Sequence, residues 1–518
     1  MSSTFMGLET AKRSLFTQTA ALNTTGHNIA NANTKGYSRQ VVNMVASQPM
    51  EAPSLTRSNT PGQLGTGVEY TSVTRIRENF LDDQYRNENK KLGSTSIQQD
   101  TLSKLEKIFN EPSDTGLQSV LGNFWSSWSD LSKDPENTDA RKVVRENAMA
   151  LTDTFQYVSK SLSDLSNDLT TNINVKVSEI NTKTAAIADL NEEIQRIEGL
   201  GDDANDLRDQ RDQLTDDLSK IASITVQRTD QGYNISLGST NLVAGKTATE
   251  TSGAALESAY ASGDLSGGEV YGMIVSRDKY VKDYQTELDT IANTIANGPV
   301  TVTIPKGSVL PEGTVISGVT YSGASRTLTD DLTVQVNGIN GLHKLGYTNL
   351  NGSLSTAGDF FTSSDGSSVT ASTIQVSEEI RNDVNEISTS MRTSTSGSTE
   401  SVVVGNNSMA LLISQLKDTK FSFTKNGVTT TATVNDYYNS DIGQLGVQAE
   451  QANRSLQNQQ ALVDQVESSR QSISGVSLDE EMSNLIKFQH AYSAAARVMT
   501  TFDEMLDKVI NSMGTVGR

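Results

Sequence analysis

The sequence predicts an α+β multidomain protein with a terminal α-helical coiled coil, an elongated helical-bundle domain and an inserted, mostly β domain. Near both ends of the chain, large apolar residues recur at the steps of a helix with one apolar face. Longer helical patterns lie inside these ends. At about 299–405, Val, Thr, Ser and Gly dominate, and apolar residues alternate with polar ones as in a strand. At roughly 150 residues per domain, the 518 residues allow about three or four domains.

Composition and charge exclude several classes of function. The chain has 42 Lys and Arg, 62 Asp and Glu, 3 His and no Cys, which gives a formal charge of −20. The absence of cysteine excludes disulfides, thiolate zinc sites and cysteine nucleophiles, and so few histidines leave little for other metal sites. The negative charge argues against nucleic acid, and no apolar run approaches the ~20 residues that span a bilayer. We therefore expect no cofactor, no nucleic-acid partner and no membrane partner.

The N-terminal segment predicts a helix with one narrow apolar stripe, followed by a turn and a β-hairpin. Asn31, Asn33 and Gly36 favour turn conformations in which a helix ends. The segments 37–45 and 68–76 have a β pattern, and the three prolines between them indicate a loop. No apolar core typical of a cleaved secretory signal is present, so any export must use another route. The stripe consists of Leu8, Leu15, Leu22 and Ile29.

The interior of the chain alternates between helical and β patterns. The residues between 223 and 272 are rich in β-formers and glycine, and a short helical piece at 377–387 interrupts the mostly β section. The seam of the longest helix changes register after residue 169, which indicates a local unwinding of a coiled coil. The remaining helices are predicted at about 76–109, 117–128, 155–194, 205–221, 278–296, 407–416 and 445–473.

The C-terminal segment predicts a last helix that begins after Gly475. Ser477 and Glu480 have the spacing of a capping box. A helix with one apolar stripe needs a partner in water, because packing of the apolar face supplies most of its stability. The first and last helices are the simplest partners for one another, and such a pair still leaves apolar surface for neighbours in an assembly. The last stripe includes Leu485, Phe488, Tyr492, Met499, Phe502 and Leu506.

Patterns that would indicate an enzyme fail on inspection. Gly245-Lys246-Thr247 resembles the end of a phosphate-binding loop, but Thr240 stands where that loop needs a glycine. The acidic cluster within 202–217 lacks the alternating ligands of a calcium loop, and we interpret it as a charged, solvated helix face. None of His27, His343 and His490 has a catalytic neighbour in the sequence. We expect a protein that is not an enzyme.

The segment from residue 28 to residue 39 resembles the N-terminal signature of bacterial flagellar rod, hook and hook-associated proteins. Further segments at 3–11, 65–81, 206–214 and 475–497 resemble the hook-associated members of this family, whereas 299–405 matches least well. In the signature, asparagines satisfy nearby backbone groups and Gly36 permits a positive φ, which suits a helix end followed by a reversal. The signature residues are Asn28, Asn31, Asn33, Gly36, Tyr37 and Arg39.

This resemblance implies a structural subunit at the junction of hook and filament. It implies a ring at the distal end of the hook, which forms after type III export and serves as a base for the next junction protein and the filament. The implied partners are further copies of the chain, the hook protein, a second hook-associated junction protein, an export chaperone and the type III export apparatus. The protein would be extracellular after a transient cytoplasmic stage, and the missing cysteines suit a chain that threads unfolded through a channel.

The resemblance also implies roles for the stripes and a division into domains. The two stripes would form the axial core of the assembly, and the chaperone would first bind Leu478, Met482, Leu485, Phe488, Tyr492 and Met499. The expected domains are a terminal coiled coil (1–65 with 475–518), a helical domain (66–298 with 406–474, with a small β part near 222–275) and an outer β domain (299–405). Two alternatives stay open: another hook-associated, hook or rod protein, or a secreted surface adhesin that acts through the middle β domain.

Overall fold

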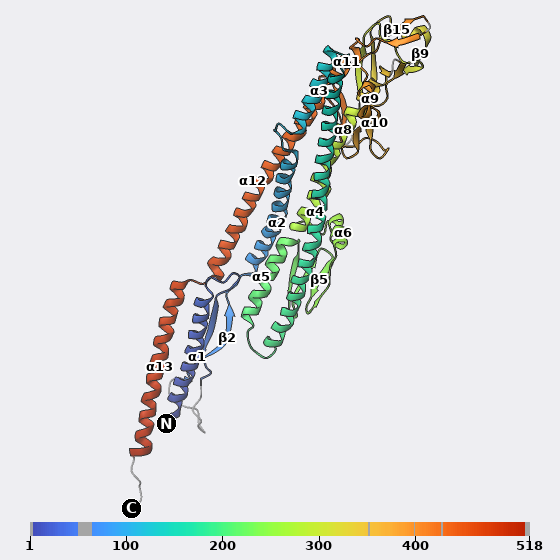
Figure 1. Ribbon diagram of the computed structural model, residues 1–518. Coiled ribbons are helices and arrows are strands. Elements are labelled where there is room, and N and C mark those ends of the chain that lie inside the picture. Colours follow the sequence, from blue (N-terminus) through green and yellow to red (C-terminus); the bar gives the residue numbers. More distant parts are fainter. Residues whose placement is uncertain (1–3, 50–64, 351–352, 398, 426–427, 513–518) are drawn as a thin grey trace, which may run out of the picture. The chain divides into compact units, whose positions relative to one another are not determined.

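The computed structural model describes residues 4–49, 65–350, 353–397, 399–425 and 428–512 (Figure 1). The chain forms two compact units. Unit 1 comprises Met1–Ser96, Ile173–Gly272 and Leu456–Arg518, and unit 2 comprises Ile97–Asn172 and Met273–Ser455. Three long helices contribute residues to both units: α2 (Asn79–Phe109), α4 (Thr138–Glu198) and α12 (Val434–Ser474).

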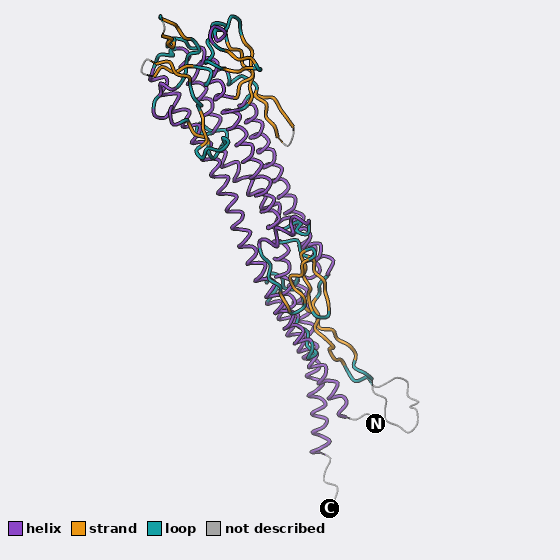
Figure 2. The backbone as a smooth tube through the Cα atoms, turned by 90° about the vertical axis from the view of Figure 1, so that its right-hand side faces the viewer, coloured by secondary structure: helices purple, strands orange, loops and turns teal. Residues whose placement is uncertain are grey.

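Unit 1 contains the two terminal helices, a β-hairpin and a helical hairpin with a small sheet. α1 (Thr4–Ala30) and α13 (Leu478–Ser512) lie side by side (Figures 1 and 2). The hairpin pairs β1 (Gln40–Ala46) with β2 (Val68–Arg75) and also packs on α1. α4 is followed by α5 (Asn205–Ile221). The antiparallel sheet has the order β3 (Thr225–Thr229), β4 (Gly232–Leu237), β5 (Thr240–Ala244), β6 (Thr247–Ala248), and α6 (Gly253–Ser262) follows it.

The terminal helices are antiparallel, because the start of α1 meets the end of α13. A Cβ atom on Gly7 would lie 2.1 Å from the Phe502 ring, so this ring packs directly on the bare backbone of the glycine. Ala11 and Ala21 on α1 and Ala495 on α13 are also buried. Small side chains thus let the two helices approach closely, and the predicted pairing of the chain's ends is confirmed.

Unit 2 combines helices with a four-stranded antiparallel sheet of order β10 (Leu332–Asn337), β7 (Pro299–Ile304), β17 (Phe421–Lys425), β18 (Val428–Ala432). Its helices are α3 (Leu117–Lys133), α7 (Glu269–Val275, which begins in unit 1), the π-helical turn Ser276–Val281, α8 (Lys282–Asn297), α9 (Gly338–His343), α10 (Glu378–Asn382) and α11 (Ser408–Gln415), with 3₁₀ turns at Gly323–Arg326 and Val384–Glu386. Two-stranded hairpins complete it: β8 (Thr314–Ile316) with β9 (Val319–Tyr321), β11 (Tyr347–Leu350) with β12 (Ser353–Thr356), β13 (Phe361–Ser363) with β14 (Ile374–Val376), and β15 (Thr393–Ser396) with β16 (Thr399–Val402).

Aromatic residues form much of the core of unit 2. Phe124, Trp125 and Trp128 on α3 are all at most 1% exposed. The ring of Trp128 lies 5.4 Å from that of Phe360, and Phe124 lies 5.9 Å from Phe361. Because large aromatic side chains bury the most apolar area per residue, this cluster supplies a core despite the low aromatic content of the chain.

Most predicted elements are present, with two differences in the type of element. The residues of α6 were predicted as part of a β-rich section, but Ala254, Ala255 and Leu256 favour a helix, and Ser252 caps its start. Strands β17 and β18 follow α11 and were not predicted; they join the sheet of the middle section. The proline-rich loop falls largely on residues 50–64, outside the described part of the chain.

The middle section is mostly β, as predicted, although short helices interrupt it. The two compact units do not test the predicted division into three domains, which stays a prediction. None of the helices in the described ranges combines the length and the apolar character that crossing a bilayer requires.

Candidate functional site

Asn28, the first residue of the signature segment, connects three elements of unit 1. Its side-chain amide donates hydrogen bonds to the carbonyl oxygen of Gln40 (2.9 Å) and to Oε2 of Glu481 (3.0 Å). Its Oδ1 accepts from the backbone N–H of Gln40 (3.0 Å) and from the hydroxyl of Tyr37 (2.7 Å). An asparagine side chain offers two donor hydrogens and one acceptor oxygen, and all are used here. This buried residue joins the end of α1, the start of β1 and the start of α13.

Arg39 makes a second connection to the C-terminal segment. Its Nε donates to Oε1 of Glu481 (2.7 Å), and one terminal nitrogen donates to Glu480 (2.9 Å). Its backbone N–H donates to the carbonyl oxygen of Ser474 at the end of α12 (2.8 Å). Glu481 is only 2% exposed, so its carboxylate is held entirely by Arg39 and Asn28. Sequence reasoning missed Glu481, because its two partners lie about 450 residues away along the chain.

Only one of the two hydrogen bonds of the predicted capping box is formed at the start of α13. The hydroxyl of Ser477 accepts from the backbone N–H of Glu480 at 3.5 Å, which is a long hydrogen bond. The carboxylate of Glu480 turns to Arg39. A salt bridge to the N-terminal signature therefore accompanies the helix cap.

The turn between α1 and β1 is built by its own polar side chains. The amide of Asn31 donates to the carbonyl oxygen of His27 (3.1 Å), and its Oδ1 accepts from the hydroxyl of Thr34 (3.1 Å). Gly36 has φ +83°, and a Cβ atom there would lie 2.7 Å from Oε1 of Gln213 on α5. The turn needs glycine for its left-handed backbone, as predicted, while Asn33 lies exposed within it.

The prediction of a solvated acidic cluster within 202–217 is wrong for Asp209, Asp212 and Asp216, which are buried, whereas Asp202, Asp203 and Asp206 are exposed. Eight charged side chains, each at most 12% exposed, form what we call the buried ion cluster: Arg75, Arg77, Asp82, Arg86, Asp209, Asp212, Asp216 and Arg470. The ion pairs join Arg75 to Asp209 (2.6 Å) and Asp212 (2.7 Å), Arg77 to Asp82 (2.8 Å), Arg86 to Asp216 (2.7 Å), and Arg470 to Asp216 (2.7 Å) and Asp82 (3.1 Å).

Four arginines and four aspartates make the cluster electrically balanced. Burial alone would raise the pKa of Asp212. The positive charges of Arg77, Arg75 and Arg86 outweigh this effect and hold the pKa of Asp212 far below its usual range. Burial likewise opposes the charge of Arg77, yet Asp212 and Asp82 raise its pKa above the ordinary value. For Asp209 burial dominates over Arg75 and Ser38, so its pKa is raised. The cluster therefore stays ionised at Asp212 and Arg77, which fixes β2, α2, α5 and α12 against one another within unit 1.

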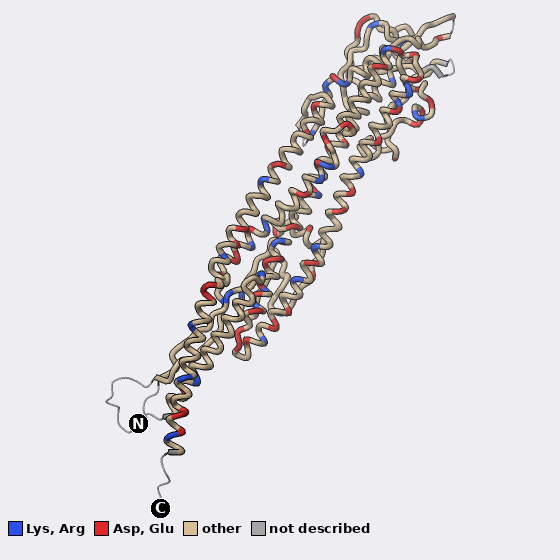
Figure 3. Tube along the Cα trace, turned by 60° about the vertical axis from the view of Figure 1, so that its left-hand side comes forward, with Lys and Arg blue, Asp and Glu red and all other residues tan. Residues whose placement is uncertain are grey.

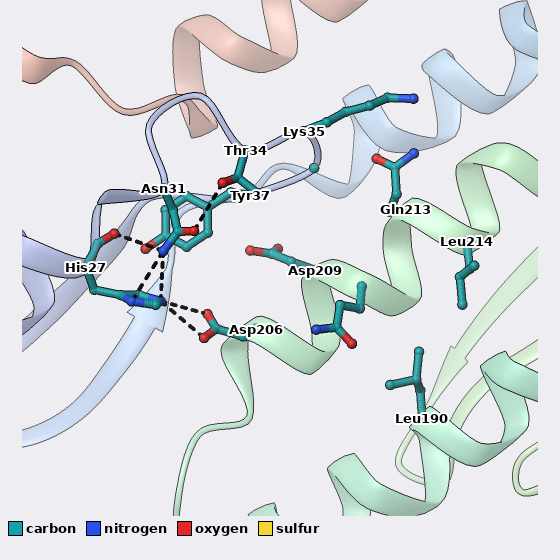
Figure 4. A pocket seen from close by; sticks show the side chains of 12 residues that line it. His27, Asn31, Thr34, Lys35, Tyr37, Leu190, Asp206, Asp209, Gln213 and Leu214 are labelled. Atoms are coloured by element: carbon teal, nitrogen blue, oxygen red, sulfur yellow. Dashed lines mark hydrogen bonds and ion pairs between the residues drawn. The ribbon is translucent and has the colours of Figure 1, made fainter. Parts of the chain in front are cut away.

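A pocket of about 450 Å³ lies between the signature turn and the α4–α5 hairpin (Figure 4). Leu190 and Leu214 form one wall, and the ring of Tyr37 faces it. His27 and Asp206 lie at the other end, 3.1 Å apart between Nε2 and Oδ2. Burial and the negative charges of Asp206, Asp209 and Glu481 raise the pKa of Tyr37, so its hydroxyl keeps its proton.

The predicted stripe residues lie on the faces of α1 and α13 that are partly covered. On α1 all four are half-buried, and on α13 five of the six are half-buried while Tyr492 is 40% exposed. Leu478 and Met482, which were predicted to bind a chaperone, are exposed as well. The half-buried residues are Leu8, Leu15, Leu22 and Ile29 on α1, and Leu485, Phe488, Met499, Phe502 and Leu506 on α13.

Further apolar residues of α13 flank this covered face on both sides. At 100° per residue, Leu478, Met482 and Ile486 fall on one side of it, and Val498, Met505 and Val509 fall on the other. All six are between 46% and 58% exposed. Such contiguous exposed apolar surface is typical of a protein interface.

No metal or catalytic constellation emerges from the described residues. They contain no group of three His, Asp or Glu side chains placed to hold a metal ion. His343 is buried in unit 2, where its Nδ1 lies 2.8 Å from the carbonyl oxygen of Gly358 and its Nε2 accepts from the N–H of Ser388 (3.0 Å). Burial lowers the pKa of His343 to about 4, so it is a neutral structural residue. Acidic and basic residues are interspersed along the described helices (Figure 3), and His490 is exposed.

Comparisons with known proteins agree with one another. Residues 102–299 match the family described as the flagellar hook-associated protein FlgK helical domain, 453–513 match the flagellar basal body rod FlgEFG protein C-terminal family, and 8–37 match the flagella basal body rod protein family. The chain is 36% identical over 534 residues to flagellar hook-associated protein 1 of Bacillus subtilis (strain 168), with 100% of both chains covered. It is 26% identical to the same protein of Escherichia coli (strain K12), with 95% of this chain and 97% of that one covered.

A solved structure described as the flagellar hook junction protein FlgK from Burkholderia pseudomallei aligns with a TM-score of 0.49 and 16% identity, covering 77% of this chain and 100% of that one. The matches to the rod families cover most of α1 with its turn, and the end of α12 with α13, and they include the hydrogen-bonded residues Asn28 and Glu481. Because the similarity to the Bacillus protein extends from end to end, the chain belongs to the flagellar hook-associated protein 1 family and is, like its relatives, a structural protein of the bacterial flagellum and not an enzyme.

Proposed function

We propose that the chain forms a ring at the hook–filament junction, in which α1 and α13 are the assembly element. One observation carries this proposal: α13 is packed on α1 along one face and exposes apolar residues on both flanks of that face. Two uncovered flanks suit a subunit with one neighbour on each side, as in a head-to-tail ring. The axial core then consists of the stripe residues of both helices together with those flanks.

The same helix is the proposed binding site for an export chaperone before assembly. Leu478 and Met482 are exposed in the free chain, whereas Leu485, Phe488 and Met499 are half-covered by α1. A chaperone that binds all of these residues must therefore displace α1 from α13, so chaperone binding would compete with ring formation. Type III export of the chain and its subsequent place outside the cell are part of this proposal.

The hook protein and a second hook-associated junction protein are the proposed partners along the flagellar axis, and the terminal coiled coil (1–65 with 475–518) is the part that would meet them. The helical domain and the β domain at 299–405 would lie outside this core. The end-to-end similarity to hook-associated protein 1 favours this role over another axial protein or an adhesin. Deletion of 299–405 tests the remaining question, whether the middle section contributes to motility.

The decisive experiment places a charge on each flank of α13 separately. Met482→Glu and Val509→Glu alter exposed side chains, so the monomer should keep its melting temperature within about 2 °C. Each variant should still be exported, but hooks should lack filaments and filament protein should accumulate in the medium. Thr501→Glu is the matched control, because Thr501 is an exposed residue of α13 on the side away from α1. Normal filaments in both flank variants would refute the assembly role of these surfaces.

A further inference from the structure

The pocket beside the signature turn combines apolar walls with an acidic end. Leu190 from α4 and Leu214 from α5 lie on one side, and the ring of Tyr37 lies opposite (Figure 4). Asp206 stands at the end of the pocket nearest His27, and its side chain is 55% exposed. The pocket has a volume of about 450 Å³, which exceeds that of any single side chain. A side chain of a partner and part of its backbone can therefore enter.

Among the described residues, the carboxylate of Asp206 has polar partners but no Lys or Arg in an ion pair with it. It accepts from the amide of Gln40 (2.6 Å) and lies 3.1 Å from Nε2 of His27. The amide nitrogen of Asn31, a donor, lies 3.3 Å from Nδ1 of His27. In this geometry Nδ1 of His27 faces a donor, and Nε2 faces the carboxylate of Asp206.

The other charged residues of the pocket do not neutralise Asp206. Among the residues that the structure describes, no Lys or Arg forms an ion pair with it, whereas the neighbouring Asp209 is matched by Arg75. Lys35 lies at the rim, but Figure 4 shows its ammonium group directed away from Asp206. The pocket is therefore apolar along its sides and negative at one end.

We propose that this pocket receives an arginine or lysine side chain from a protein partner. The methylene stem of such a side chain packs against Leu190 and Leu214, and its cationic head reaches Asp206. Arginine fits best, because its planar guanidinium stacks on an aromatic ring such as Tyr37 and binds a carboxylate through two nitrogens. An apolar side chain would leave the carboxylate unmatched, and an acidic one would be repelled. The signature turn then has a second role, since it supplies a wall of the pocket as well as joining α1 to β1.

The test is a titration of the full chain, labelled with ¹³C at its leucine methyl groups, and observed by NMR. The probe is N-acetyl-arginine methylamide, and its neutral isostere N-acetyl-citrulline methylamide is the matched comparison. We expect saturable shifts of the Leu190 and Leu214 methyl signals with the arginine probe, and binding of the citrulline probe weaker by roughly tenfold, because the charge-assisted hydrogen bond is lost. Asp206→Asn should remove this preference, whereas Asp202→Asn, at an exposed turn residue that does not line the pocket, should preserve it.

Equal shifts with both probes, or none with either, would overturn the proposal. So would a preference for arginine that survives in Asp206→Asn. The comparison of the two probes on the unaltered chain needs no variant, so a folding defect in Asp206→Asn leaves the test intact. A small-molecule probe also makes the result independent of ring formation by the terminal helices.

Discussion

Replacing Asp212 by asparagine tests whether the buried ion cluster holds unit 1 together. Asp212 is 0% exposed and lies 2.7 Å from Arg75, 3.4 Å from Arg86 and 3.6 Å from Arg77. Asparagine has almost the same shape, so Asp212→Asn removes the charge without making a cavity. It leaves four guanidinium groups facing three carboxylates in a buried site.

The expected loss of stability depends on which carboxylate partners each arginine keeps. Breaking a buried ion pair by removing one partner typically costs about 3 to 5 kcal/mol. Here Arg75 keeps Asp209 at 2.6 Å and Arg86 keeps Asp216 at 2.7 Å, so we expect the lower end, about 3 kcal/mol. A change of 1.36 kcal/mol alters an equilibrium constant tenfold. A loss of about 3 kcal/mol therefore corresponds to roughly 10²-fold faster exchange of those amide hydrogens whose local unfolding requires the cluster to break.

Hydrogen exchange with mass spectrometry measures this locally. Peptides from α5 and β2 should exchange faster in Asp212→Asn, while peptides around Trp125 and Trp128 in unit 2 report on general damage. Asp217→Asn is the matched control: Asp217 lies on the same helix, is 41% exposed and pairs with Lys183 at 3.6 Å, so its loss should cost at most about 1 kcal/mol. Adding Arg75→Met to Asp212→Asn restores the charge balance and should recover part of the loss. The reasoning is refuted if the peptides from α5 and β2 exchange their amide hydrogens at the same rate in Asp212→Asn and in Asp217→Asn.

Three further predictions concern single residues. Glu481→Gln should cost about 2 kcal/mol and increase proteolysis near residue 475, because Arg39 loses the buried one of its two carboxylate partners; an unchanged cleavage rate would contradict this. Gly36→Ala should destabilise by about 1 kcal/mol in urea unfolding, because alanine resists φ +83°; a neutral or stabilising effect would show that the turn relaxes. Burial and Glu287 raise the pKa of Asp441 to about 7, against the effect of Lys425, whereas its unfolded value is about 3.9. Between these two pH values the folded state binds more protons than the unfolded state, so the free energy of unfolding should fall as pH rises from about 4 to 7. Asp441→Asn should flatten this pH dependence in thermal unfolding followed by tryptophan fluorescence. Equal slopes for the variant and the unaltered chain would argue against the prediction.

Local patterns predicted the terminal helices and the signature turn, because the forces that form them act between residues close in sequence. The seven-residue spacing of Leu8, Leu15 and Leu22 marks one helix face whatever its partner is. Gly36 marks the reversal because only glycine adopts its backbone conformation at little cost. Neither pattern says which residues of α13 lie opposite, and the contact of Gly7 with Phe502 became visible only in the structure.

The buried ion cluster could not be predicted from the same kind of pattern. Asp209, Asp212 and Asp216 repeat along one face of α5, which in isolation indicates a solvated charged face. Their partners Arg75 and Arg470 lie on either side of them in the sequence and are separated by about 400 residues. Burial of a charge depends on whether an opposite charge reaches it in space, and no local period encodes that.

The packing of the terminal helices supports the proposal that neighbouring subunits complete them. Gly7 of α1 packs against Phe502 of α13, and the buried apolar residues of the two helices are Ala11, Ala21 and Ala495, which bury little apolar area each. Stability of a helix in water comes mainly from burial of its apolar face, and here much of that face on α13 stays exposed in the single chain. The hydrogen bonds of Asn28 and Arg39 hold only the Glu481 end of the pair. Toward Ile510, which is 70% exposed, we expect neighbouring subunits of the proposed ring to cover this end of α13 and to stabilise the pair of helices.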